Sequence, residues 1–322
     1  MLGNRTGWII AVVIGLVLCY GMNMLSGAVE ASGVTARVAK DPKYLLPIEL
    51  IPGPETVVAM NEPGDSAIAY QAAIDLYTAN PMIYDRWDSA NIDKLEAVEK
   101  LLEVTHFKEM HLFDKNPGKV INFANSKDPV EALRIVGNMA ARKAQLLKLR
   151  KKPEEAKKYA EAAFALGAKM FKERVIFEEY DAGMGLLGVG ADFLKTMAVE
   201  ENDTAKSTKA DEFINARKNL IGTAGRLFDQ RSITKSIDGN VSGLRAGDVF
   251  ALATKSQERL WRVEACLQLA RTARNVGNNG RGTDQRHARA LLEQLALDPD
   301  PIIRTAAIKA RDITDDEYHK QN

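Results

Sequence analysis

Several residue types that mark particular classes of protein are scarce in this chain. Only two of its 322 residues are cysteines, Cys19 and Cys266, and they lie far apart in unlike surroundings. Two such residues predict neither a disulfide framework nor a cysteine metal site. The formal net charge is +1, so there is no broad electrostatic field that would attract nucleic acid or an anionic membrane surface.

Aromatic residues are also few, at 7%, whereas alanine and leucine are abundant, and this balance favours helix over sheet. No stretch alternates between apolar and polar residues convincingly enough to require a sheet. Apolar residues make up 46% of the chain, which is ample for a hydrophobic core. We therefore predict an all-α protein.

Charge is absent from one long segment near the N-terminus. Residues 8–29 are uncharged, follow Arg5 and are about as long as the ~20 residues that cross a bilayer core. We interpret residues 1–29 as a membrane anchor or signal sequence, with the membrane contacted through residues 8–29 and the folded part outside the cytoplasm. A cleaved signal peptide is the alternative, because Ser26-Gly27-Ala28 resembles its cleavage site. Residues 30–63 contain five prolines and no periodicity, which predicts an extended spacer.

Helical periodicity begins after the spacer, and we assign residues 64–229 to one array of helices. Its clearest part is a pair of apolar stripes within 133–167, separated by Lys151-Lys152-Pro153. Pro153 suits the first position of a second helix, so the two stripes predict a helical hairpin. The other expected helices are 66–79, with Asp65 or Ser66 as its cap, then 92–106, 171–199 and 208–229. Residues 230–247 read as a loop.

The 133–167 hairpin resembles a tetratricopeptide repeat. Small and aromatic positions of that family are occupied by Ala144, Leu147, Ala156, Ala160 and Ala163. The hairpin departs from the family at Ala140, where a tryptophan is usual, and at Ala168, where a proline closes the unit. The resemblance implies a helical-repeat fold and says nothing about a ligand.

The last region, 248–322, is predicted to be helical, with one helix over 248–274, a linker at 275–283 and a hairpin after it. Asp300 is the expected N-cap and Pro301 the first residue of the final helix. Residues 285–313 resemble a HEAT repeat in their Asp-Pro turn, in Arg304 and in their paired alanines. Arg311 stands where that family usually has a buried leucine, and a polar residue there suits a terminal, capping unit.

One glycine motif has the spacing of a dinucleotide-binding loop. It consists of Gly183, Gly185 and Gly188, with Glu200 at the approximate place of a ribose-binding acid. Such a loop needs a buried strand before the glycines and a helix start after them, and residues 177–181 do not predict that strand. We therefore interpret the glycines as points where helices pack closely.

Two further patterns have a functional and a structural interpretation. Glu103 and His106 have the spacing of a di-iron carboxylate–histidine pair, but no second pair exists and His111 falls on another side of the helix. The region 259–289 is locally basic, which suits phosphate binding or a solvated helix face. Its arginines are Arg259, Arg262, Arg271, Arg274, Arg281, Arg286 and Arg289.

From these patterns we predict a membrane-tethered helical-repeat scaffold that binds a protein partner and is not an enzyme. We assign no catalytic, cofactor-binding or metal-ligating residue and expect no cofactor and no nucleic acid. Two alternatives stay open. One is a nucleotide- or cofactor-dependent enzyme that uses the 183–190 glycine run, and the other is a peripheral subunit that binds nucleic acid or anionic lipid through the arginines near 259–289.

Overall fold

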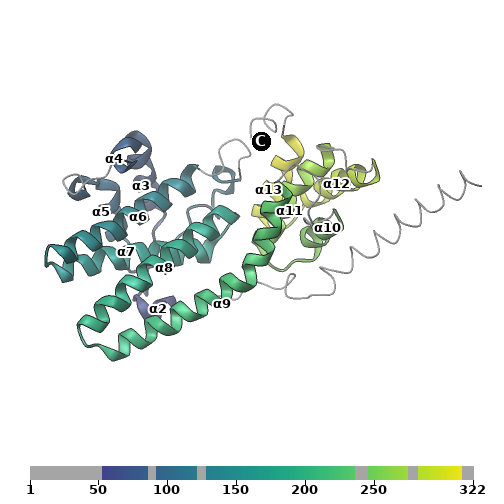
Figure 1. Cartoon of the computed structure of the whole chain (residues 1–322). Coiled ribbons are helices and arrows are strands. Elements are labelled where there is room, and N and C mark those ends of the chain that lie inside the picture. Colours follow the sequence, from purple (N-terminus) through teal and green to yellow (C-terminus); the bar gives the residue numbers. More distant parts are fainter. Residues whose placement is uncertain (1–52, 86–91, 122–127, 236–245, 275–281, 314–322) are drawn as a thin grey trace, which may run out of the picture.

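The structure is a computed structural model, and it describes residues 53–85, 92–121, 128–235, 246–274 and 282–313 (Figure 1). Within these ranges the chain forms twelve α-helices and one two-stranded sheet. The prediction of a mostly helical protein is therefore confirmed. The anchor or signal sequence predicted over residues 1–29 lies outside the described residues, and so does most of the 30–63 spacer.

The end of the predicted spacer is not extended throughout. Helix α2 (Pro54–Val57) begins at a proline, whose fixed φ suits a first helical position, and strand β1 (Glu62–Asp65) follows. Asp65 then accepts a hydrogen bond at 3.0 Å from the backbone amide of Ala67, the first residue of α3 (Ala67–Ala79). Of the two predicted caps, Ser66 is the N-cap residue but its side chain makes no capping bond, and the side chain that contacts the helix start is that of Asp65. A short helix, α4 (Pro81–Asp85), comes next.

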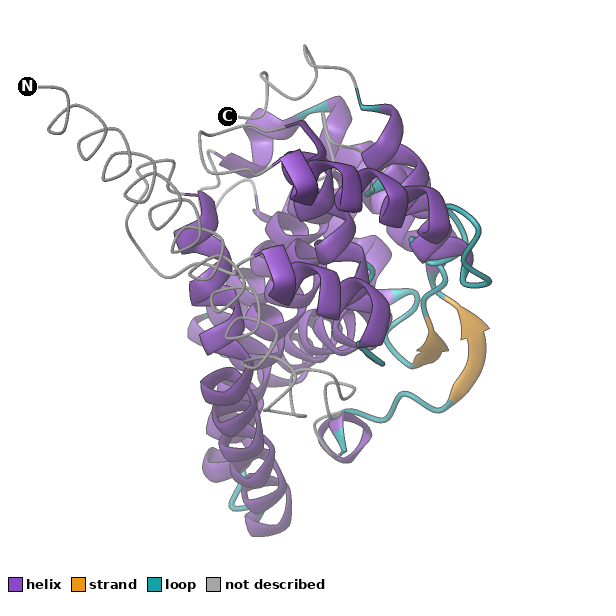
Figure 2. Ribbon diagram, turned by 90° about the vertical axis from the view of Figure 1, so that its right-hand side faces the viewer, coloured by secondary structure: helices purple, strands orange, loops and turns teal. Residues whose placement is uncertain are grey.

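The predicted helix over 92–106 was wrong in its second half. The structure has a 3₁₀ turn η2 (Ile92–Lys94), helix α5 (Glu96–Leu102) and then strand β2 (Phe107–Glu109), which pairs in parallel with β1. The amide of Glu62 donates to the carbonyl of His106 at 3.0 Å, so a partner distant in sequence takes the chain out of the helix. Figure 2 shows the two strands at the edge of the helices.

Four long helices follow the turn η3 (Pro117–Lys119) and form most of the N-terminal group, by which we mean α2 to α9. They are α6 (Asp128–Leu149), α7 (Pro153–Glu173), α8 (Phe177–Glu200) and α9 (Thr204–Lys235), and each packs against the next (Figure 1). The α6–α7 hairpin with Pro153 at the start of α7 is as predicted. Every residue from Ala162 to Phe171 is buried, so α7 is the central helix of this group.

The C-terminal group comprises α10 (Ala246–Lys255), α11 (Arg259–Arg274), α12 (Gly282–Leu295) and α13 (Pro301–Asp312). The single helix predicted over 248–274 was wrong, because the chain breaks at 256–258. There the Ser256 hydroxyl accepts from the Glu258 amide at 3.1 Å. The loop predicted over 230–247 was also too long, since α9 continues to Lys235. Asp300 caps α13 as predicted, accepting from Ile302 N at 2.8 Å.

The two groups meet near the corner between α7 and α8. Turn η3 of the N-terminal group packs against α13, and a β-carbon placed on Gly118 would lie 3.8 Å from Cε of Lys309. Helix α9 runs along α8 and ends beside the C-terminal helices (Figure 1). The corner therefore sits where the described parts of the two groups touch.

Candidate functional site

The α7–α8 corner brings together several charged side chains that are buried or half-buried. Glu173 is the last residue of α7, Glu179 is the third residue of α8, and Asp114 lies in the loop between β2 and η3. Arg174, between the two helices, faces the C-terminal group. Charged groups are costly to bury unless they are paired, so this cluster needs a physical account.

Glu173 fixes the loop that contains Asp114. Its Oε1 accepts hydrogen bonds from the backbone amides of Phe113 and of Asp114, the second at 2.5 Å. The pKa of Glu173 is raised to about 7, chiefly by burial and also by the Asp114 carboxylate, against the lowering effect of the loop amides. Because Glu173 lies at the carbonyl end of α7, the helix dipole also disfavours a negative charge there.

Glu179 lies in the first turn of α8. It is completely buried, and its Oε2 accepts from the amide of Val175 at 2.7 Å, so the side chain reaches back over the first helical turn. Burial raises the pKa of Glu179 well above its usual range, and repulsion from Glu173 and Asp114 adds to this increase. A carboxyl group in this position favours its protonated form.

Each of the three carboxyl groups also has one buried oxygen without a hydrogen-bond partner. These atoms are Oδ1 of Asp114, Oε2 of Glu173 and Oε1 of Glu179. A buried carboxylate oxygen without a donor is costly, whereas a protonated carboxyl can itself donate a hydrogen bond. For Glu173 and Glu179, the burial and the unpartnered oxygens therefore both favour a bound proton.

Arg174 connects the corner to the C-terminal group. Its Nε and Nη2 each donate to a carboxylate oxygen of Glu258, both at 3.2 Å, and the two side chains are 13% and 4% exposed. Such a bidentate pair out of contact with water depends on both partners, because either one alone would be a buried charge. Arg174 has a backbone φ of +28°, which a non-glycine residue rarely adopts.

Lys169 lies one turn before Glu173 and is also buried. Its ammonium group donates to the carbonyl of Val104 at 2.5 Å and to the hydroxyl of Tyr70 at 3.2 Å, both of which are neutral acceptors. Burial lowers the pKa of Lys169 to about 7. Helix α7 thus holds a buried lysine and a buried glutamate whose pKa values both lie near neutrality.

Sequence reasoning did not identify this cluster, although one signal was present. Lys169 and Glu173 continue, at helical spacing, the face of α7 on which Ala162 and Leu166 are buried. A charged residue on an otherwise apolar face indicates either the end of burial or a buried charge. The partners Asp114 and Glu258 lie far away in sequence and could not be paired with α7 in advance.

The glycine motif lies inside α8 and does not have the geometry of a dinucleotide-binding loop. A β-carbon on Gly183 would lie 2.7 Å from the amide nitrogen of Phe171, and one on Gly190 would lie 2.7 Å from Cβ of Phe164. These two glycines allow α7 and α8 to pack closely, as predicted. The prediction fails for Gly185, where a β-carbon would meet nothing within 4 Å. Gly188 faces the guanidinium of Arg217.

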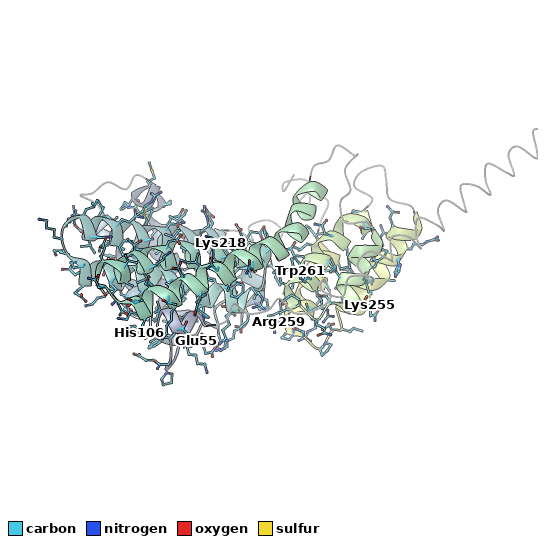
Figure 3. The ribbon with its side chains drawn as sticks, turned by 60° about the horizontal axis from the view of Figure 1, so that its bottom comes forward. Glu55, His106, Lys218, Lys255, Arg259 and Trp261 are labelled. Carbon is cyan, nitrogen blue, oxygen red and sulfur yellow. The ribbon has the colours of Figure 1, made fainter. Side chains whose placement is uncertain are left out.

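Glu103 and His106 are not brought together with other ligands. Glu103 pairs with Lys100 at 2.6 Å, and Nδ1 of the exposed His106, labelled in Figure 3, lies 2.8 Å from the carbonyl of Ala59. His111 lies 2.8 Å from Asp114 instead. Among the described residues, no group of three or more histidine, cysteine, aspartate or glutamate side chains could hold a metal ion.

Several of the arginines near 259–289 have structural partners. Arg259 pairs with Asp300 at 3.0 Å, and Arg262 pairs with Asp298, so both hold the Asp-Pro turn of the last hairpin (Figure 3 labels Arg259). Arg289 donates to the carbonyl of Ala273 at 3.2 Å, at the end of α11. Arg281 lies outside the described residues, as does the side chain of Arg271.

A pocket of about 460 Å³ lies at the end of α11 and α13, lined in part by Arg274, Arg289 and Arg311. Arg274 donates to the carbonyls of Ala310, at 3.2 Å, and of Ile313. Carbonyl ends of helices are electronegative, so they favour these arginines and oppose a bound anion. Glu293, 3.2 Å from Arg311, reduces the positive charge further. The pocket therefore does not support the phosphate-binding alternative.

Comparisons with known proteins add no family. No family model matches the chain, and neither a curated protein nor a solved structure matches it.

The segment predicted to contact the membrane, residues 8–29, lies outside the described residues. Within them, one helix, α8, is long and apolar enough to cross a membrane, but 56% of its apolar window is buried inside the protein, as in a core helix.

Proposed function

We propose that the protein is a membrane-tethered helical scaffold that binds a protein partner and catalyses no reaction. Residues 8–29 supply the tether, and the helical hairpins supply an extended surface of the kind that helical-repeat proteins use for binding. The observation that supports this proposal best is the packing of consecutive helices against one another in both groups, α6 to α9 and α10 to α13. The step from this fold to a binding function is an analogy with helical-repeat proteins.

One end of the α6–α9 array offers an apolar contact for a partner. Leu149, at the end of α6, is 79% exposed, and Val199, near the end of α8, is 56% exposed. The ion pair between Lys148 and Glu200, at 2.7 Å, holds these two helix ends side by side. Exposed apolar side chains rimmed by charged ones are typical of protein-binding surfaces.

Photo-crosslinking in the native host tests the partner. With a photoreactive residue at Val199 of the full chain, we expect a discrete adduct, and Leu149→Glu should abolish it. Leu297→Glu is the matched control, because Leu297 is 84% exposed but belongs to the C-terminal group. An adduct that survives Leu149→Glu, or no adduct from Val199, would count against this binding end.

Membrane attachment and the enzyme alternative are tested separately. Deletion of residues 1–30 should release a folded helical protein from the membrane fraction, whereas a mature N-terminus near Val29 would establish a cleaved signal peptide. A saturable rise in melting temperature with NAD, FAD or ATP would contradict the non-enzymatic proposal, because a ligand bound only by the native state stabilises it.

A further inference from the structure

The corner cluster combines two features that no structural role alone requires. Three carboxyl groups, from Asp114, Glu173 and Glu179, are gathered with one unpartnered buried oxygen each. The same corner is where the N-terminal and C-terminal groups touch. A change of charge at the corner is therefore placed to alter how the two groups are held together.

The charged groups that the structure describes on neighbouring elements contact partners other than Glu173 and Glu179. From the loop, His111 contacts Asp114, and Lys115 pairs with Asp65 at 2.9 Å. On α7, Lys172 pairs with Glu109 at 2.9 Å. At the corner, Arg174 pairs with Glu258 of the C-terminal group, and Tyr180 of α8 is buried nearby. Among the described residues, none of these contacts neutralises Glu173 or Glu179 directly, so a bound proton is what would relieve their unpartnered oxygens.

Two physical links lead from the carboxyls to the C-terminal group. Glu173 holds the amides of Phe113 and Asp114, and the same loop continues into η3, which packs against α13. The next residue in the chain, Arg174, forms the bidentate pair with Glu258. Movement of Glu173 would therefore disturb both contacts at once.

We propose that Glu173 and Glu179, which lie beside the charge of Asp114, form a proton-dependent latch between the two groups of helices. Protons bound by these carboxyl groups keep the 110–116 loop on the α7–α8 corner and keep η3 against α13. When the protons leave, negative charges repel one another in a buried place, the loop separates from the corner, and the C-terminal group changes its position. This inference is independent of the partner-binding proposal.

The direction of the response follows from the protonation equilibria. The pKa of Glu173 is raised from its ordinary 4.5 to about 7, so protons favour the latched state fully below about pH 4.5, and this preference is lost as the pH rises through about 7. A released state in which a carboxyl regains its ordinary pKa binds fewer protons than the latched state. The ratio of released to latched molecules then rises about tenfold per pH unit for each proton lost, over the interval between the two pKa values.

Distance measurements between spin labels test the latch in the full chain in detergent. Ile68→Cys and Leu297→Cys are suitable sites, because these side chains are 86% and 84% exposed and belong to different groups. Cys19→Ser removes one native thiol, and Cys266 is fully buried. We expect one distance population at about pH 5.5 and a second, growing population at about pH 8.5.

Three variants make the result specific. Glu173→Gln with Glu179→Gln is neutral at every pH and should keep the low-pH distance throughout, and Asp114→Asn provides a second variant if that pair does not fold. Glu161→Gln is the matched control, since burial also raises the pKa of Glu161 on the same helix, but its charged neighbours are other residues: Lys157, His106, Lys206 and Glu154. This control should respond as the wild type does.

Three outcomes would overturn the latch. The first is a wild-type distance distribution that does not change with pH. The second is a glutamine pair that responds as strongly as the wild type. The third is restoration of the low-pH distance at high pH by Mg²⁺ or Ca²⁺, which would show that the cluster binds a cation and not protons.

Discussion

Gly183 and Gly185 lie two residues apart on α8, yet a methyl group should have opposite effects at the two positions. Gly183→Ala brings a β-carbon within 2.9 Å of the carbonyl oxygen of Gly167, a backbone atom that cannot move alone. We expect a loss of about 1–3 kcal/mol in the free energy of unfolding. Gly185→Ala meets open space and should gain about 0.5–1 kcal/mol, because alanine favours the helix. Denaturant unfolding of both variants measures the difference.

Each glycine is the control for the other, since the substitution and the helix are the same. Equal losses at both positions would contradict the structure. The glycine spacing alone predicted packing at both sites. It could not separate them, because the exposed side of a helix is identified only when its neighbours are placed.

Because of Lys169, the free energy of unfolding should increase with pH. Its pKa is about 7 in the folded state and 10.5 ordinarily, so the unfolded state binds more protons between these values. Stability then increases as pH rises from about 7 to about 10.5. Lys169→Met removes the titrating group and should remove this increase. Unfolding measured across that pH interval tests it, and an unchanged slope in the variant would show that other groups cause it.

The buried charges show what the sequence could and could not reveal at this scale. Periodicity placed α7 correctly and so placed Lys169 and Glu173 near its apolar face. Their protonation depends on Val104, Phe113 and Asp114, which reach α7 only through the β1–β2 pairing and the loop after it. No local pattern encodes these distant contacts.

Among the elements, α13 has a capping interaction that can be tested by itself. Asp300 accepts from the Ile302 amide through Oδ1 and pairs with Arg259 through Oδ2. Asp300→Ala should lower the free energy of unfolding by about 1 kcal/mol. Asp300→Asn keeps a capping oxygen and loses only the charge, so it should cost less. Asp312→Ala, at the exposed other end of α13, is the control in thermal unfolding, and a loss there as large as for Asp300→Ala would argue against the cap.

Element boundaries were predictable where the local sequence sets them and not elsewhere. Pro153, Asp300 and Pro301 fixed helix starts that the structure confirms. The break at 256–258 contains neither proline nor glycine, and it depends on Glu258, which pairs with distant Arg174. Strands β1 and β2 span only four and three residues, too few for alternation to show. Non-local pairing therefore explains both errors.

For the whole molecule, we expect the last hairpin to stabilise the helix before it. Leu292 and Ile303 are buried, and α12 and α13 both pack on α11. Ending the chain at Asn279 removes both helices, so it should expose the apolar face of α11 and promote aggregation. Leu292→Ala should be milder, costing about 2–5 kcal/mol because a buried side chain leaves a cavity.

Hydrogen exchange on the truncated chain measures this coupling. Protection across 250–270 should fall, while the 133–167 hairpin stays comparatively protected, because stability in stacked helices is set mainly by nearest neighbours. Unchanged protection across 250–270 would mean that the C-terminal hairpin is an independent appendage. The idea of one continuous helical array would then have to be abandoned.

Helix α2 determines where mechanical tension would enter the folded part. The described chain begins at Gly53, and α2 packs directly against α9 (Figure 1). Helix α9 has 32 residues and is therefore a rod of about 48 Å. A pull on the preceding residues would reach this rod through α2 before it reached the β1–β2 pair. The contact between α2 and α9 would therefore bear tension from the N-terminus first.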